Sequence, residues 1–170
     1  TIIAALRAGR VGAPEACGMK LVLWPGEADL VNAHQSSLAF LMELGRWDMC
    51  VRYGLLRTMF RDRYIPVMAA QTIQYIRPLR RFRFYQMTTR LACWDERFFF
   101  VEHRVERAGK LHAVGFSREL WRSRGRNVPT AEVLAAIGAP AESPPAPPEI
   151  ESWMLSQRGD ALAKAAARRG

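Results

Sequence analysis

The spacing of hydrophobic residues changes near residue 63, from a helical period to an alternating one. Between 38 and 51, in LAFLMELGRWDMCV, apolar residues fall on nearly every side of a helix, which predicts a long helix enclosed by other elements. Asn32, with Gln35 three residues later, resembles a capping box and places the helix start at about residue 32 or 33. Gly54 is a suitable helix terminator, and the LLRTMFRD that follows it predicts a short turn.

Residues 63–124 are rich in β-formers, and their runs are separated by connections of two to four residues. The run FFFVEHRVE alternates clearly, with apolar side chains and one histidine on one face: Phe99, Val101, His103 and Val105. Short connections impose antiparallel neighbours. The sequence therefore predicts a basic antiparallel sheet of four strands, wrapped against the long helix.

The two ends of the chain differ from this centre. MKLVLW at 19–24 predicts a strand that ends at a proline–glycine turn. PTAEVLAAIG at 129–138 predicts a short helix, APAESPPAPPE a stiff proline-rich linker, and the remaining residues a terminal helix. We therefore predict an α+β domain at 19–126 and a C-terminal extension at 127–170.

Charge is distributed unevenly over a chain of net charge +9. From residue 46 to 126 there are 18 arginines and lysines against 7 acidic residues. This surplus suits a polyanionic partner such as nucleic acid, an anionic membrane or a phosphate-bearing ligand. It is equally compatible with a soluble surface that is simply rich in arginine.

The number of cysteines and the hydropathy of the chain indicate the compartment in which we expect the protein. Cys17, Cys50 and Cys93 are odd in number and widely spaced, which predicts reduced thiols in a cytoplasm-like compartment, with Cys50 and Cys93 as core residues. No stretch is long and apolar enough to predict a membrane span, and residues 1–18 do not resemble a signal peptide.

The sequence lacks the motifs of several kinds of catalysis and ligand binding. The sequence contains no G-x-S-x-G elbow and no glycine-rich nucleotide loop. His34, His103 and His112 are not clustered with cysteines or carboxylates at ligand spacing, so no metal site is predicted. His103 and His112 are interpreted as ordinary sheet residues.

The remaining candidate chemistry lies between Glu27 and Ser37. This stretch brings two carboxylates, including Asp29, and the His34 imidazole to the first turn of the predicted helix. Free backbone N–H groups at a helix start can polarise a thioester or enoyl carbonyl, and a carboxylate can attack it or orient a water. The competing interpretation is that Ser36 and Ser37 merely cap the helix.

These residues carry a family resemblance over roughly 19–124. DLVNAHQSSLAFL resembles the D-x-x-G-H-x-N-N-x-x-Y-L helix start of the hot-dog fold, 4-hydroxybenzoyl-CoA thioesterase-like family, with an antiparallel sheet around one central helix. Asp29 matches the catalytic aspartate, one residue further from the histidine than usual, and His34 matches that histidine. Ser36 and Ser37 stand where the family has asparagines that bind substrate.

The resemblance implies an acyl-CoA thioesterase that needs no cofactor beyond the coenzyme A of its substrate. It also implies a homodimer or dimer of dimers, with sheets joined edge to edge and acyl-CoA at the interface. Arg80 and Arg81 are the candidates to contact the coenzyme A phosphates.

Three alternatives remain open. The serines favour a non-catalytic acyl-binding protein of the same fold. The five-residue spacing of Asp29 and His34 is that of (R)-specific enoyl-CoA hydratases, although their D-x-N-P-x-H pattern is not reproduced. Nucleic-acid binding is supported by charge alone, because no aromatic-basic strand motif is present.

Overall fold

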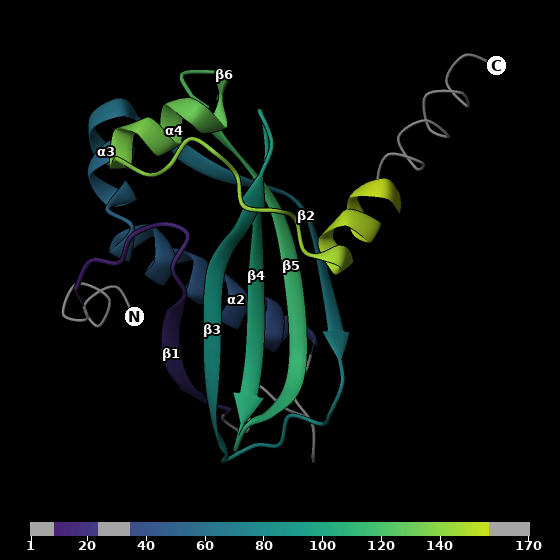
Figure 1. Ribbon diagram of the computed structural model, residues 1–170. Helices are drawn as coiled ribbons and strands as arrows, with labels where there is room; N and C mark the ends of the chain where they lie inside the picture. The colour runs from purple at the N-terminus through teal and green to yellow at the C-terminus, as the bar shows by residue number, and fades with distance from the viewer. Residues whose placement is uncertain (1–8, 24–34, 157–170) are drawn as a thin grey trace.

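The computed structural model describes residues 9–23 and 35–156, in which an antiparallel sheet curves around one long helix (Figure 1). The strand order is β1-β3-β4-β5-β2, with β6 paired to β5. The strands are β1 (Cys17–Val22), β2 (Ile65–Tyr75), β3 (Phe84–Trp94), β4 (Phe99–Arg107), β5 (Lys110–Ser123) and β6 (Arg126–Val128). The helices are α2 (Gln35–Arg52), α3 (Leu55–Asp62), α4 (Thr130–Ile137) and a segment at 148–156.

The predicted α+β fold with an antiparallel sheet around one long helix is confirmed. The four strands expected across 63–124 are β2 to β5, and the strand expected at 19–24 is β1. The expectation that consecutive strands are neighbours holds from β3 to β5 but is wrong for β2, because the longer connection 76–83 lets β2 pair with β5 and not with β3. The short helix expected at 129–138 is α4, which begins after Pro129. The helix start expected at residue 32 or 33 lies outside the described residues.

The short turn predicted after Gly54 is wrong, because residues 55–62 form the two-turn helix α3. Gly54 and Arg63, both in the left-handed backbone region with φ of 82° and 55°, bracket this helix. Leu55 and Thr58, one turn apart, are its buried residues. Strand β6 was not predicted either, since its three residues are too few to display alternation.

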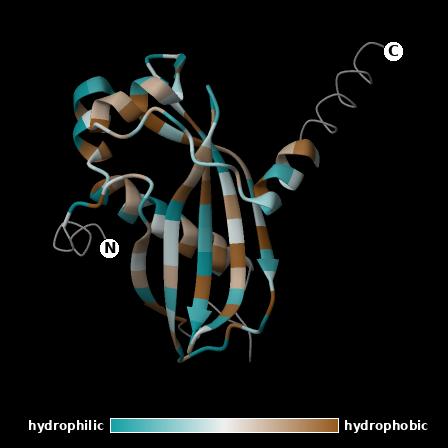
Figure 2. Cartoon of the chain, in the orientation of Figure 1, coloured by the Kyte–Doolittle hydropathy of each residue, from teal (hydrophilic) through white to brown (hydrophobic). Residues whose placement is uncertain are grey.

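Helix α2 lies against one face of the sheet and packs its apolar side chains onto that face. Leu38, Leu41 and Met42 belong to one buried cluster, and Met49 and Cys50 to another. At Gly45 a Cβ atom would lie 2.4 Å from Thr89 Oγ1, so glycine lets the helix approach the sheet closely. Along the strands, hydrophobic and hydrophilic residues alternate visibly (Figure 2).

Residues 139–156 cover the opposite face of the sheet. In Figure 1 they cross in front of the sheet, whereas α2 lies behind it. Ile150 is fully buried in a cluster with Phe100 and Phe116, and the Trp153 ring meets Phe100 edge-on at 6.4 Å. The Trp94 ring N–H donates to the Ala141 carbonyl at 3.3 Å. Both faces of the central strands are therefore buried.

Candidate functional site

The predicted site residues fall only partly within the described structure. Asp29 and His34 lie outside the described residues. Ser36 lies in the first turn of α2, with its side chain outside the description, and Ser37 is half-buried in the same turn. The described residues that surround the helix start therefore define the geometry of the site.

A basic cavity of about 420 Å³ lies at the end of the sheet where the β2–β3 connection meets the β4–β5 turn. Its cationic and imidazole side chains come from both segments and the adjoining strands: Arg77, Arg80, Arg83, Arg107, Lys110 and His112. Arg80 thus lines the cavity. Arg81 does not, and its guanidinium instead stacks 5.7 Å from the centre of the Phe82 ring.

Hydrogen bonds hold the β2–β3 connection against the neighbouring strands. The Arg77 guanidinium donates to the Leu111 carbonyl at 2.6 Å, and a His112 ring nitrogen lies 3.0 Å from the Pro78 carbonyl. The Tyr85 hydroxyl accepts from the Arg80 backbone N–H at 2.7 Å. The arginines therefore project from a fixed backbone rather than from a free loop.

No described carboxylate neutralises the cations of this cavity. The ion pairs within residues 9–23 and 35–156 involve other arginines, such as Arg90 with Glu102 and Arg126 with Glu132. Unpaired cations gathered around a cavity produce a positive potential that attracts phosphate groups. The cavity is thus chemically suited to a ligand with several phosphates.

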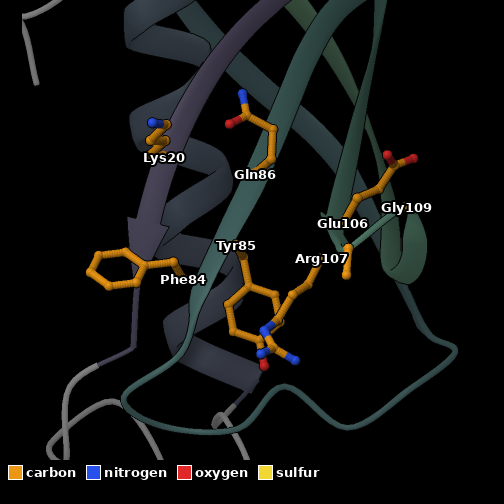
Figure 3. Close-up of a pocket in the computed structure, with 8 residues that line it drawn as sticks. Lys20, Phe84, Tyr85, Gln86, Glu106, Arg107 and Gly109 are labelled. Carbon is orange, nitrogen blue, oxygen red and sulfur yellow. The ribbon is translucent and has the colours of Figure 1, made fainter.

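A second cavity of about 520 Å³ adjoins the first one, and Tyr85 and Arg107 line both. Its other side chains come from β1, β3 and the end of β4, including Lys20, Phe84 and Glu106 (Figure 3). Phe84 is 74% exposed, so it offers an apolar face to a ligand beside the basic one. Together the two cavities can accept a molecule with both phosphate and flat apolar parts.

The connection that carries Arg80 packs into the same core cluster as the beginning of α2. Leu79, between Pro78 and Arg80, is buried in one cluster with Leu23 and with Leu38 of α2. The Phe82 backbone N–H also donates to the Leu23 carbonyl at 2.9 Å. Both flanks of the chain that carries Asp29 and His34 are therefore anchored beside the cationic connection.

A buried polar row crosses the sheet beneath the middle of α2. The Thr89 hydroxyl and a His103 ring nitrogen are 3.0 Å apart, and Arg46 of α2 donates to Glu119 at 2.9 Å. Burial, reinforced by the positive charge of Arg46, lowers the pKa of His103 to about 3. His103 is therefore neutral at physiological pH and does not act as an acid–base group there.

Among the described residues no group of histidines, cysteines and carboxylates could hold a metal ion. None of the described helices is long and apolar enough to cross a membrane. Cys17, Cys50 and Cys93 are free and buried, and burial raises the pKa of the Cys17 and Cys93 thiols to about 11. These thiols are core side chains and not nucleophiles.

Comparison with known proteins defines the class. The profile of the thioesterase-like superfamily matches residues 23–154, and the chain belongs to this family. The fold is shared with solved hot-dog proteins. A 1,4-dihydroxy-2-naphthoyl-CoA thioesterase from Synechocystis has a TM-score of 0.62 and 7% identity, covering 72% of this chain and 95% of that chain. The Staphylococcus aureus protein SAV2348, solved in complex with CoA, has a TM-score of 0.65 and 11% identity, covering 81% and 94%.

The chain is also similar to Protein THEM6 of Xenopus laevis, with 31% identity over 137 residues. The match covers 78% of this chain and 64% of the relative. The chain thus spans a little under two thirds of the length of that relative.

The basic cavity was only partly visible in the sequence. Arg80 was singled out because it lies in the 77–83 connection, but Arg107 and Lys110 come from a turn about thirty residues away. The signal that would have joined them is the antiparallel order of the strands, because alternate connections of an antiparallel sheet lie at the same end. The buried Arg46–Glu119 pair gave no signal, since a charged residue within a helix normally faces solvent.

Proposed function

We propose that this protein hydrolyses acyl-CoA thioesters. The observation that carries the proposal is a cluster of cations that no described carboxylate pairs, on a connection that shares a core cluster with the beginning of the central helix, in a member of the thioesterase-like superfamily. A thioester carbonyl at the helix start would meet free backbone N–H groups, and the phosphates of its coenzyme A would extend to the basic cavity. No cofactor beyond the coenzyme A of the substrate is proposed.

The proposed chemistry combines the start of α2 with the residues that match the family's pattern. The amides at the start of α2 polarise the carbonyl and stabilise the oxyanion that forms when a nucleophile adds to it. Asp29 either adds directly or removes a proton from the attacking water, and His34 assists its orientation. Ser36 and Ser37 donate hydrogen bonds to the substrate. The oxyanion then collapses, the C–S bond breaks, and coenzyme A leaves as thiolate. Where water attacked, the proton held by Asp29 passes to the thiolate and the acid is released. Where Asp29 attacked, a water hydrolyses the acyl–Asp29 anhydride, which releases the acid and restores the carboxylate.

Phosphate binding is assigned first to Arg80, with Arg81 of the same connection and the other cations of the cavity in support. Each charge-assisted contact with a phosphate contributes about 1.5–3 kcal/mol when it is shielded from water, and less at an exposed arginine. The phosphates of coenzyme A are a sufficient ligand for the basic charge, so nucleic acid is not proposed as a partner.

We further propose that the protein acts as a homodimer joined through β2, in a reducing, cytoplasm-like compartment. β2 is the last strand of the sheet and pairs only with β5 among the described strands. Its exposed apolar side chains include Ile65, Val67 and Met68. An unpaired apolar edge is suited to pairing with a second copy. The three free cysteines support the compartment.

The test is a hydrolysis assay over short-, medium-, long-chain and aromatic acyl-CoAs. Asp29→Asn should abolish hydrolysis, whereas full activity in that variant would remove Asp29 from the mechanism. Binding of acyl-CoA without hydrolysis of any thioester would instead indicate a non-catalytic acyl-binding protein. Formation of a 3-hydroxyacyl product from enoyl-CoA would indicate the hydratase.

Phosphate recognition is tested by comparing acyl-CoA with the same acyl group on pantetheine, which lacks the nucleotide. Arg80→Glu/Arg83→Glu should reduce kcat/KM for acyl-CoA strongly and bring the ratio of the two substrates close to one. The matched control is Arg57→Glu/Arg124→Glu, which makes the same charge change at exposed positions away from the cavity. An equal effect of both double variants would show only a general electrostatic role.

A further inference from the structure

A second group of arginines lies at the end of the sheet opposite the basic cavity. The cavity is at the end where β5 begins, whereas these arginines come from α3 and from the two-residue turn that joins β5 to β6 (Figure 1). Lys110 and Ser123, the first and last residues of β5, are about 40 Å apart along the strand at about 3.3 Å per residue. Coenzyme A bound in the basic cavity therefore does not account for this second group.

The end of α3 and the β5–β6 turn lie side by side. The Ser123 hydroxyl, at the end of β5, donates to the carbonyl of Asp62, the last residue of α3, at 2.8 Å. On α3 itself, Arg57, Phe60 and Arg61 are three or four residues apart and share the exposed face of the helix. Together these segments form one surface, called here the α3 surface, with Phe60 and the exposed arginines Arg57, Arg61, Arg63, Arg122, Arg124 and Arg126.

Most of the positive charge of the α3 surface is not neutralised. Arg61 forms an ion pair with Asp62 at 2.7 Å, and Arg126 forms one with Glu132 at 2.7 Å. Within residues 9–23 and 35–156, no carboxylate forms an ion pair with the other four arginines, Arg57, Arg63, Arg122 and Arg124. The α3 surface therefore presents four cations to a polyanionic partner.

Two of these four arginines occupy positions where the backbone favours other residues. Arg63 at the end of α3 and Arg124 in the β5–β6 turn have φ of 55° and 49°, in the left-handed region. Glycine is the usual residue at such a helix end, and asparagine is the usual residue before the glycine of such a two-residue turn. Local stability therefore does not explain an arginine at either position, whereas a partner that requires the charge does.

An exposed aromatic ring lies among these cations. Phe60 is 83% exposed, more than any other large apolar side chain of the described residues. Cations that meet lipid phosphates, beside an aromatic ring that enters the apolar layer, are typical of binding at a membrane surface. Duplex nucleic acid would satisfy the cations but leave the ring in water. Proteins that bind single strands usually stack successive bases on several aromatic rings, whereas Phe60 is the one exposed ring in the described α3 surface.

We propose that the α3 surface binds an anionic membrane, with Phe60 inserted below the lipid head groups and the four unpaired arginines in contact with lipid phosphates. The proposal does not depend on the proposed hydrolysis. Each arginine near an anionic membrane strengthens binding about fivefold, and an inserted phenylalanine strengthens it about tenfold. The contribution of the arginines decreases as salt screens their charge, and the contribution of Phe60 does not.

Co-sedimentation of the full chain with vesicles tests the proposal. Vesicles of phosphatidylcholine alone are compared with vesicles of phosphatidylcholine and phosphatidylglycerol in a ratio of about two to one, at low and at high salt. The variants are Arg57→Glu/Arg124→Glu and Phe60→Ser. The double variant also serves as the control of the phosphate test above, but that assay contains no membrane, so the two sites are tested independently.

Each variant has a matched control outside the α3 surface. Arg80→Glu/Arg83→Glu makes the same change of charge at the opposite end of the sheet. Leu155→Ser removes an apolar side chain that is 67% exposed on another helix. Circular dichroism of all four variants verifies that they fold like the wild type.

The wild type should bind the anionic vesicles and not the neutral ones, and high salt should weaken the binding. Arg57→Glu/Arg124→Glu should lower the partition coefficient by about 25-fold or more and Phe60→Ser by about tenfold, each clearly more than its control. Absence of binding to the anionic vesicles, or equal losses in each variant and its control, would overturn the proposal. If Phe60→Ser bound vesicles like the wild type but lost affinity for single-stranded RNA, the surface would be a nucleic-acid site and the proposal would be wrong.

Discussion

Arg46 lies between two carboxylates, Glu119 in the core and Glu43 at the surface, and forms an ion pair with each. This asymmetry predicts unequal costs for removing either buried partner. Arg46→Met leaves Glu119 buried with the Ser117 hydroxyl as its one side-chain donor among the described residues, and should destabilise the fold by about 3–5 kcal/mol. Glu119→Met leaves Arg46 paired with Glu43 and should cost clearly less.

Urea unfolding of both single variants and of the double variant measures these costs. The double variant should be close to the wild type in stability, since no unpaired charge remains in the core. Additive costs in the double variant would show that the two side chains do not interact in solution.

His103 predicts a pH dependence of stability with a definite sign. The pKa of His103 is lowered from 6.5 to about 3, mainly by burial and further by the charge of Arg46. Between these two pH values the unfolded chain binds a proton at His103 and the folded chain does not. The stabilisation is complete above pH 6.5 and is lost as the pH falls toward 3, by about 1.4 kcal/mol per pH unit below 6.5.

The contribution of His103 is obtained by measuring the free energy of unfolding of the wild type and of His103→Gln between pH 7.5 and 4.5. The carboxylates titrate in both proteins, so their effect cancels in the difference. The difference between the two should fall with this slope below pH 6.5. A constant difference would mean that His103 is protonated in the folded protein.

At the scale of single elements, the segment 148–156 is predicted to stabilise the domain through its contact with the outer face of the sheet. Ile150 is 0% exposed, whereas Leu155 on the same helix is 67% exposed. Ile150→Ala should therefore lower the free energy of unfolding by about 2–4 kcal/mol, and Leu155→Ala by much less. Thermal unfolding followed by circular dichroism distinguishes them, and equal effects would contradict docking of this segment.

Helices and strands long enough to repeat their hydrophobic pattern several times could be predicted from the sequence, and shorter ones could not. β4 could be predicted because Val101 and Val105 lie on one face of the strand and Glu102, Arg104 and Glu106 on the other, and both valines are buried. Helix α3 was missed because two turns contain only one repeat of the helical pattern, Leu55 and Thr58. The alternation in β4 predicted that one face of the strand is exposed, whereas Phe100 and Glu102 on that face are buried.

The candidate site was predictable only as far as it is local in sequence. The arginines of the 77–83 connection stood out as a run, and Arg80 lines the basic cavity. Arg107 and Lys110 join it through sheet topology, and Arg46 meets Glu119 through packing of α2, neither of which leaves a local pattern. The roles of Asp29 and His34 stay predictions, tested by the assay and not by the fold.

At the scale of the whole molecule, the two edges of the sheet differ. β1 at one edge has six residues and includes Lys20, whereas β2 at the other has eleven and exposes Ile65 and Val67 at 61% and 37%. A long apolar edge without charge invites pairing with another strand, and a lysine on it prevents that pairing. This asymmetry predicts that copies of the protein associate through β2 and not through β1.

Ile65→Lys/Val67→Lys should therefore convert a dimer into a monomer of 19.3 kDa, as measured by light scattering after size exclusion. Leu155→Lys places a lysine on another exposed apolar residue and should leave the dimer intact. A wild-type mass of four chains would mean that dimers pair further, and β2 would still be tested by whether the double variant removes the first association. If the proposed site lies at this interface, the monomeric variant should also lose acyl-CoA hydrolysis while retaining its fold. A monomeric wild type, or a dimer that survives the double variant, would contradict association through β2.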